Sequence, residues 1–165
     1  MMSMDEKKQI QLDRMRFTKN TLGSRLVYLA ILFDVLYFVS VYESDVGTWY
    51  YQALIGVSIV YNLVFMLIAF LASEGVKNYR QGFSWVLCAL GAGQIVRIFI
   101  WPTQAHATSV TVAGQEILAM SNGQFVRAVI YLAASAACLF VAAAVNFTKS
   151  RALKAHIAGL EGQKA

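Results

Sequence analysis

The chain of 165 residues is 58% hydrophobic and 14% charged, whereas roughly a quarter of the residues in an ordinary soluble domain are charged. This composition argues against a soluble globular protein, and the short connections between apolar segments leave no room for a second, soluble domain. The net charge is +5, but the basic residues flank apolar segments and do not alternate with aromatic residues. We therefore expect contact with the lipid bilayer and no nucleic-acid partner.

Four segments approach the roughly 20 apolar residues that a helix needs to cross a bilayer. Because the alternating pattern of an outer-membrane barrel is absent, helices must satisfy the backbone hydrogen bonds. We predict an all-α integral membrane protein, a four-transmembrane-helix bundle with helices at about 26–42, 49–72, 83–101 and 125–147. The membrane domain then covers 25–147, between an amphipathic N-terminal arm, 1–24, and an amphipathic tail, 148–165.

The distribution of Lys and Arg predicts the orientation of the helices. These residues lie before the first helix, between the second and third, and after the fourth, whereas the connections 43–48 and 102–124 contain neither. Basic residues are enriched in cytoplasmic loops, so both termini are predicted to be cytosolic. The brief loops and small size favour the bacterial inner membrane as the location.

The outer side is predicted to carry an interfacial aromatic belt. Its members are Trp49, Tyr50, Tyr51 and Trp101. Pro102 is expected to end the third helix. The outer loop 102–124 fits a hairpin or an interfacial segment, but an ordered loop is the favoured interpretation.

Apolar residues recur among charges in both terminal segments. They are Ile10, Met15 and Phe17 in the arm and Leu153, Ile157 and Leu160 in the tail. Two interpretations are open for such stripes: a helix that lies on the lipid headgroups, which is favoured, or a helix that docks onto a partner subunit.

Asp34 and Arg97 are ionisable residues within apolar segments, where an unpaired charge costs at least roughly 2.5 to 3.5 kcal/mol. At about 1.5 Å per residue, Asp34 lies about 12 Å inside the outer end of the first helix and Arg97 about 6 Å inside that of the third. Because Arg is long, a pair between them is plausible, and Tyr37, one turn from Asp34, could add a hydrogen bond.

Arg127 lies on the outward side of the fourth helix, against the positive-inside trend. One interpretation is an outward-opening polar pocket of Asp34, Gln94, Arg97 and Arg127 that holds an anion, a lipid headgroup or an acidic partner segment. The other, which is favoured, is a structural Asp34–Arg97 pair with Arg127 extending to the interface.

Polar and small residues within the helices indicate helix packing. Ser58, Tyr61 and Asn62 lie near the bilayer centre of the second helix, where hydrogen bonds between helices are favoured over ligands on a transport path. Small residues predict that the third and fourth helices pack closely. These residues are Ala89 and Gly93 on the third helix and Ala134, Cys138 and Ala142 on the fourth.

Signatures of an enzyme are missing from the sequence. His106 and His156 have no neighbouring ligands at metal-site spacing, and no nucleophile stands beside a base. We therefore expect no enzymatic activity, no metal and no cofactor. The first functional hypothesis is an accessory or structural subunit of a larger membrane complex, with a membrane-protein partner or self-association. The alternative is a small oligomeric transporter or channel.

Overall fold

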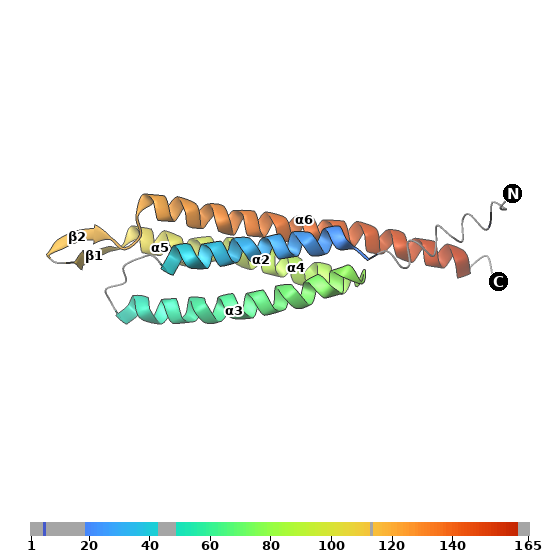
Figure 1. Ribbon diagram of the computed structural model, residues 1–165, viewed down its shortest axis with the longest axis horizontal. Coiled ribbons are helices and arrows are strands. Elements are labelled where there is room, and N and C mark those ends of the chain that lie inside the picture. The colour runs from blue at the N-terminus through green and yellow to red at the C-terminus, as the bar shows by residue number, and fades with distance from the viewer. Residues whose placement is uncertain (1–4, 6–18, 43–48, 113, 162–165) are drawn as a thin grey trace.

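The computed structural model describes residues 5, 19–42, 49–112 and 114–161, and the long helices run antiparallel to their neighbours in the chain (Figure 1). The four long helices are α2 (Thr21–Tyr42), α3 (Trp49–Lys77), α4 (Gly82–Ile100) and α6 (Asn122–Glu161). Between α4 and α6 lie the short helix α5 (Pro102–Ala107) and a hairpin of β1 (Ser109–Val112) and β2 (Gln115–Leu118). All four long helices are long and apolar enough to cross a membrane, which confirms that part of the prediction.

The fourth long helix extends much further than the predicted span of 125–147. Residues 148–158 include neither Gly nor Pro, so nothing in this stretch interrupts the helix, and α6 continues to Glu161. A helix of 40 residues measures about 60 Å, twice the hydrocarbon thickness of roughly 30 Å. The amphipathic stretch of the tail is therefore a direct continuation of the fourth helix.

The core of the bundle is formed mainly by α6, which packs against both α2 and α4, whereas α3 packs mainly on α2. One buried apolar cluster contains Phe65, Leu87 and Leu139. A second cluster, which contains Tyr37 and Leu132, lies toward the end that carries α5 and the hairpin. Apolar side chains on the outer faces of the helices remain exposed, as expected for surfaces that contact lipid.

At the end opposite the hairpin, α2 and α3 approach each other through small and polar residues. The backbone N–H of Asn20 donates to the carbonyl of Lys77 at 3.0 Å. The hydroxyls of Ser24 and Ser73 form a buried hydrogen bond of 2.7 Å. A Cβ added at Gly23 would lie 2.7 Å from Val76, so the helices can approach this closely only because Gly23 has no side chain.

At the same end, α6 holds the turn between α3 and α4. Asn146 donates to the carbonyl of Arg80 at 3.1 Å and to the hydroxyl of Ser84 at 2.7 Å. Ser150 donates to the carbonyl of Tyr79 at 3.0 Å. Tyr79 has a φ of +57°, a conformation that commonly ends helices. Polar side chains of α6 therefore satisfy carbonyls that the turn leaves without helical partners.

The outer loop differs from the favoured interpretation of an ordered loop. The β-branched stretch from Val110 to Val112 pairs with β2, and Ser109 is opposite Leu118 in an antiparallel register. Gly114 in the turn has a φ of +82°. The sequence left a hairpin open, and the alternation of strand-forming residues around this glycine explains why it forms.

Trp101 was expected in an interfacial belt, but it is only 5% exposed and packs in the second core cluster. The short helix α5, which begins at Pro102, follows α4 after the single residue Trp101. The ring of His106 stacks on Phe125 with centroids 4.7 Å apart, and its Nδ1 lies 3.2 Å from the carbonyl of Met120. Trp101 belongs to the same apolar cluster as Ala105, Met120 and Phe125. Side chains of the other three belt residues, 49–51, lie outside the described set.

α4 and α6 pack against each other as predicted, but through different residues on α4. Ala89 is exposed, and Gly93 faces α3, where an added Cβ would lie 2.9 Å from the hydroxyl of Tyr61. Gly91 faces α6, because its added Cβ would lie 3.1 Å from the Phe140 ring. Residues two apart point in directions that differ by about 200° around a helix. The prediction that Gly93 faces α6 was therefore wrong by two residues.

On α6, the predicted small residues lie at and beside the core. Ala142 is fully buried, and Ala134 and Cys138 are half-buried. Cys138 and Cys88 are both free and both pack against the first core cluster. Ser135 is fully buried and donates to the carbonyl of Ala30 on α2 at 3.0 Å, so this side of α6 also contacts α2.

The close approach of α3 to the start of α4 can be tested at Gly75. An added Cβ there would overlap the ring of Phe83, whereas Gly56 on the same helix faces open space. Gly75→Ala should lower stability by about 1 to 3 kcal/mol through overpacking, and Gly56→Ala should be neutral or stabilising by up to about 1 kcal/mol. Thermal unfolding of both variants in detergent measures this, and equal melting temperatures would contradict the described packing.

Candidate functional site

The candidate site is a group of polar side chains buried where α2, α3 and α4 meet. We call it the Arg97 site. It consists of Asp34 and Tyr37 on α2, Ser58 and Tyr61 on α3, and Gln94 and Arg97 on α4. All six residues were singled out on sequence, in two separate groups. The structure brings them together.

An ion pair joins α4 to α2 at the centre of the site. Nη1 of Arg97 lies 3.0 Å from Oδ1 of Asp34. Arg97 is 6% exposed and Asp34 is 0% exposed. Gln94 lies one turn before Arg97 on the same face of α4, and its Nε2 donates to the same carboxylate oxygen at 2.9 Å. The length of the Arg side chain allows it to reach the deeper Asp34, as the depth argument anticipated.

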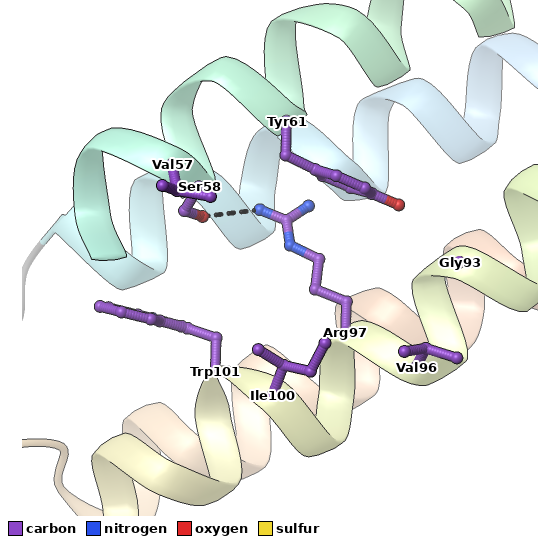
Figure 2. Close-up of a pocket in the computed structure, with 8 residues that line it drawn as sticks. All are labelled: Val57, Ser58, Tyr61, Gly93, Val96, Arg97, Ile100 and Trp101. Carbon is purple, nitrogen blue, oxygen red and sulfur yellow. Dashed lines mark hydrogen bonds between the residues drawn. The ribbon is translucent and has the colours of Figure 1, made fainter. Parts of the chain in front are cut away.

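The same guanidinium also reaches α3. Nη2 of Arg97 donates to the hydroxyl of Ser58 at 3.0 Å, and Figure 2 shows the side chain extending from α4 between Ser58 and Tyr61. Its Cζ lies 4.8 Å from the centroid of the Tyr61 ring and 4.3 Å from that of Tyr37. Such cation–π contacts stabilise a desolvated guanidinium by about 2 kcal/mol. Arg97 thus connects its own helix, α4, to both α2 and α3.

Two polar residues near the site have roles that differ from the sequence expectation. The hydroxyl of Tyr37 makes no hydrogen bond to Asp34, so this residue contributes its ring face to Arg97 instead. Asn62, on α3, is buried, and neither its Nδ2 nor its Oδ1 has a hydrogen-bond partner in the described part of the chain. The hydrogen bond between helices that was expected for Asn62 is therefore absent from the described contacts.

The electrostatics of the site are those of a neutral, paired group. The positive charge of Arg97 is balanced by Asp34 at contact distance, and both are withdrawn from solvent. Removing one partner of a buried pair leaves an uncompensated charge, which costs about 3 to 5 kcal/mol. These contacts can hold α2, α3 and α4 in one fixed register. This role requires no conformational change.

A cavity of about 240 Å³ lies beside the guanidinium, between α3 and α4 (Figure 2). It is lined by Val57, Ser58, Tyr61, Gly93, Val96, Arg97, Ile100 and Trp101. Of the four residues expected to line an outward polar pocket, only Arg97 is among them. Asp34 and Gln94 are buried behind it in the ion-pair group, and Arg127 is exposed on α6. The cavity is mostly apolar because the polar groups bond to one another.

The described residues contain no candidate metal site. Within the described residues, no three His, Cys, Asp or Glu side chains lie close enough together to hold a metal ion. Comparisons of the chain with models of protein families, with curated proteins and with solved structures found no match. The class that the fold defines is therefore the broad one: a helical protein with four helices of membrane-spanning length and hydropathy.

The charge balance at the site can be tested with a double-mutant cycle. Asp34→Asn and Arg97→Gln should each lower stability by about 3 to 5 kcal/mol, because each leaves one buried charge unpaired. The double variant should recover much of that loss. The yield of folded protein and its unfolding in detergent measure the effect.

Exposed Arg25 on α2 provides the matched control, and Arg25→Gln should change stability by less than about 0.5 kcal/mol. If the losses of the two single variants simply add in the double variant, Asp34 and Arg97 are not coupled and the structural role is refuted.

The Ser58 contact can be tested separately, through the shape of the Arg side chain. Arg97→Lys keeps a positive charge for Asp34, but Lys lacks the planar fork that bonds to Asp34 and Ser58 at once. We expect a loss close to that of Ser58→Ala, about 1.5 to 3 kcal/mol. Unfolding of both variants in detergent measures this loss of stability. If Arg97→Lys is as stable as the unchanged protein, the hydrogen bond from Arg97 to Ser58 on α3 does not contribute to stability.

Proposed function

We propose that this chain is a non-catalytic accessory or structural subunit of a larger membrane complex. The observation that carries the proposal is that the charged groups of the Arg97 site bond to one another, while Oδ2 of Asp34, Oε1 of Gln94 and the Tyr37 hydroxyl are buried without a hydrogen-bond partner in the described residues. The guanidinium bonds to Asp34 and Ser58 and stacks on two Tyr rings, and Gln94 bonds to the same carboxylate. These side chains hold three helices together and leave little polar surface for handling a substrate.

We further propose that the chain is inserted into the inner membrane of a bacterial cell and that both of its termini lie in the cytosol. The positions of the basic residues support this orientation. Residues at the start of α2, at the turn between α3 and α4, and in the later part of α6 gather at one end of the bundle (Figure 1). They are Arg25, Lys77, Arg80, Lys149, Arg151 and Lys154. The hairpin and α5 at the other end contain neither Lys nor Arg, as outer segments commonly do.

A small oligomeric transporter or channel is the second candidate, and the cavity beside Arg97 is the observation that favours it. Its wall carries the guanidinium, which could attract an anionic solute or a lipid headgroup. A selective path needs polar groups along its length, however, and the cavity lining is predominantly apolar. This favours the accessory role.

The proposal predicts copurification with a larger partner. A tagged full-length chain, expressed at its native level, is extracted from its own membrane with mild detergent, and the proteins that remain attached are identified by mass spectrometry. We expect stoichiometric recovery of a larger membrane protein. A tagged, unrelated membrane protein of similar size, extracted in parallel, reports non-specific association.

Recovery of the chain alone, as a defined oligomer that moves a solute in liposomes, would refute the accessory role. In that case Arg97→Gln should abolish flux if the cavity beside Arg97 is the path, whereas Arg25→Gln should leave it unchanged.

A further inference from the structure

The last part of α6 extends beyond the rest of the bundle (Figure 1). Ser150 bonds to the carbonyl of Tyr79 at 3.0 Å, and Lys154 donates to Oε1 of Gln81 at 2.8 Å. These are the last hydrogen bonds between α6 and other described elements. We call residues 151–161 the α6 extension. It is about 16 Å long at 1.5 Å per residue.

The face that α6 buries inside the bundle continues along this extension. Asn146 and Ser150 are buried, and the next residues at helical spacing, Leu153 and His156, are half-buried, whereas the other residues between 151 and 159 are exposed. Beside them, Ile157 is 41% exposed. A helix that carries an apolar stripe stabilises itself by burying that stripe against another element.

The direction of the extension decides between the two interpretations of the amphipathic tail. α6 is one unbroken helix from Asn122 to Glu161, so the extension continues the line of the part that would span the membrane (Figure 1). Under the proposed orientation, on which this inference rests, it points away from the bilayer into the cytosol. A helix in that direction cannot lay its apolar stripe on the headgroups, which leaves docking onto another segment.

The start of α2 identifies the segment that can cover the stripe. Asn20 immediately precedes α2, and its Oδ1 accepts a hydrogen bond of 3.1 Å from Nζ of Lys149. The chain before Asn20 therefore enters the structure at the base of the α6 extension. It comprises 1–19, more residues than an extension of this length needs for a helical partner. Since α2 and α6 are antiparallel, a helix that continues α2 backward would lie beside the extension.

The contact between Asn20 and Lys149 also sets the register of such an antiparallel pair. Counting in opposite directions from it, Phe17 is level with the region of Leu153, and Ile10 is level with the region of Leu160. Residues seven apart lie on the same face of a helix, so a helical arm would present Ile10 and Phe17 together to Leu153 and Leu160.

The polar residues match in the same register. Asp13 is level with His156, whose Nε2 is buried without a hydrogen-bond partner in the described residues. A carboxylate there would accept a hydrogen bond from this ring nitrogen. The charge pattern and the apolar pattern therefore agree on one alignment.

We propose that the N-terminal arm, residues 1–18, docks along the α6 extension of the same chain as an antiparallel helix, so that the two form a stalk on the cytosolic side. Ile10 and Phe17 cover Leu160 and Leu153, and Asp13 meets His156. The alternative occupant, the extension of a second copy, is an outcome of the test.

Disulfide crosslinking of the full-length protein tests the proposal. Ile10→Cys and Leu160→Cys are introduced together into a chain in which Cys88 and Cys138 are replaced by Ser, and a protease site is inserted at the hairpin turn at Gly114. After oxidation of the purified protein in detergent and proteolysis, the two halves should stay joined without reductant and separate with it. Ile10→Cys with Ala158→Cys, which is exposed and lies about 200° around the helix from Leu160, is the control and should crosslink several-fold less.

A crosslinked band at the size of two chains would overturn the proposal in favour of a second copy, and equal crosslinking of both pairs would overturn the register. A second pair, Phe17→Cys with Leu153→Cys, repeats the test if the first variant does not fold. No crosslink in either folded pair would also overturn the proposal. Because the experiment uses the purified chain alone, its result does not depend on whether a larger membrane protein copurifies.

Discussion

The arrangement of the half of the bundle next to the hairpin depends on one constraint: Arg97 lies within an apolar segment and its charge has to be compensated there. Asp34 is the only carboxylate in the four predicted spans, so α2 must face α4 at the depth where Arg97 can reach it. The guanidinium fork then has a second side available for Ser58 on α3. One side chain thereby fixes the relative depth of three helices, and the aromatic rings of Tyr37 and Tyr61 shield it from lipid.

At the opposite end of the bundle, the buried polar groups that need partners are neutral, and neutral groups bond to them. The turn between α3 and α4 exposes backbone carbonyls, and the side chains of Asn146 and Ser150 bond to them. These bonds secure α6 to the turn before the helix leaves the bundle. The carbonyls are neutral, so the neutral donors of Asn146 and Ser150 suffice for them, whereas the buried charge of Arg97 needs a charged partner. The two ends are thus held by different interactions, which suits a protein whose proposed role is to present a fixed surface to a partner.

Much of the Arg97 site could be predicted from sequence because depth along a helix follows from residue counting. The pairing of Asp34 with Arg97 followed from their distances to the outer helix ends. Ser58 and Tyr61 were recognised as polar residues near the bilayer centre, but their contact with Arg97 was not foreseen, since it depends on how α3 tilts and turns relative to α4. The rotation of α4 about its own axis could not be predicted for the same reason. Gly93 was therefore expected to face α6, whereas Gly91, two residues earlier, does so. Arg127 was grouped with Arg97 on depth alone, and it lies on the exposed side of α6.

The sequence by itself determined the four long apolar helices and indicated a plausible pair of Asp34 with Arg97, which lie at compatible depths. These follow from local properties: apolar length sets the helices, and the cost of an unpaired charge in lipid sets the pair. Only the tertiary structure decided which faces meet, that Trp101 is buried, and that α6 continues straight past the bundle. Rotation about a helix axis and the direction of a helix end depend on contacts between distant segments, and hydrophobicity along one segment contains no information about them.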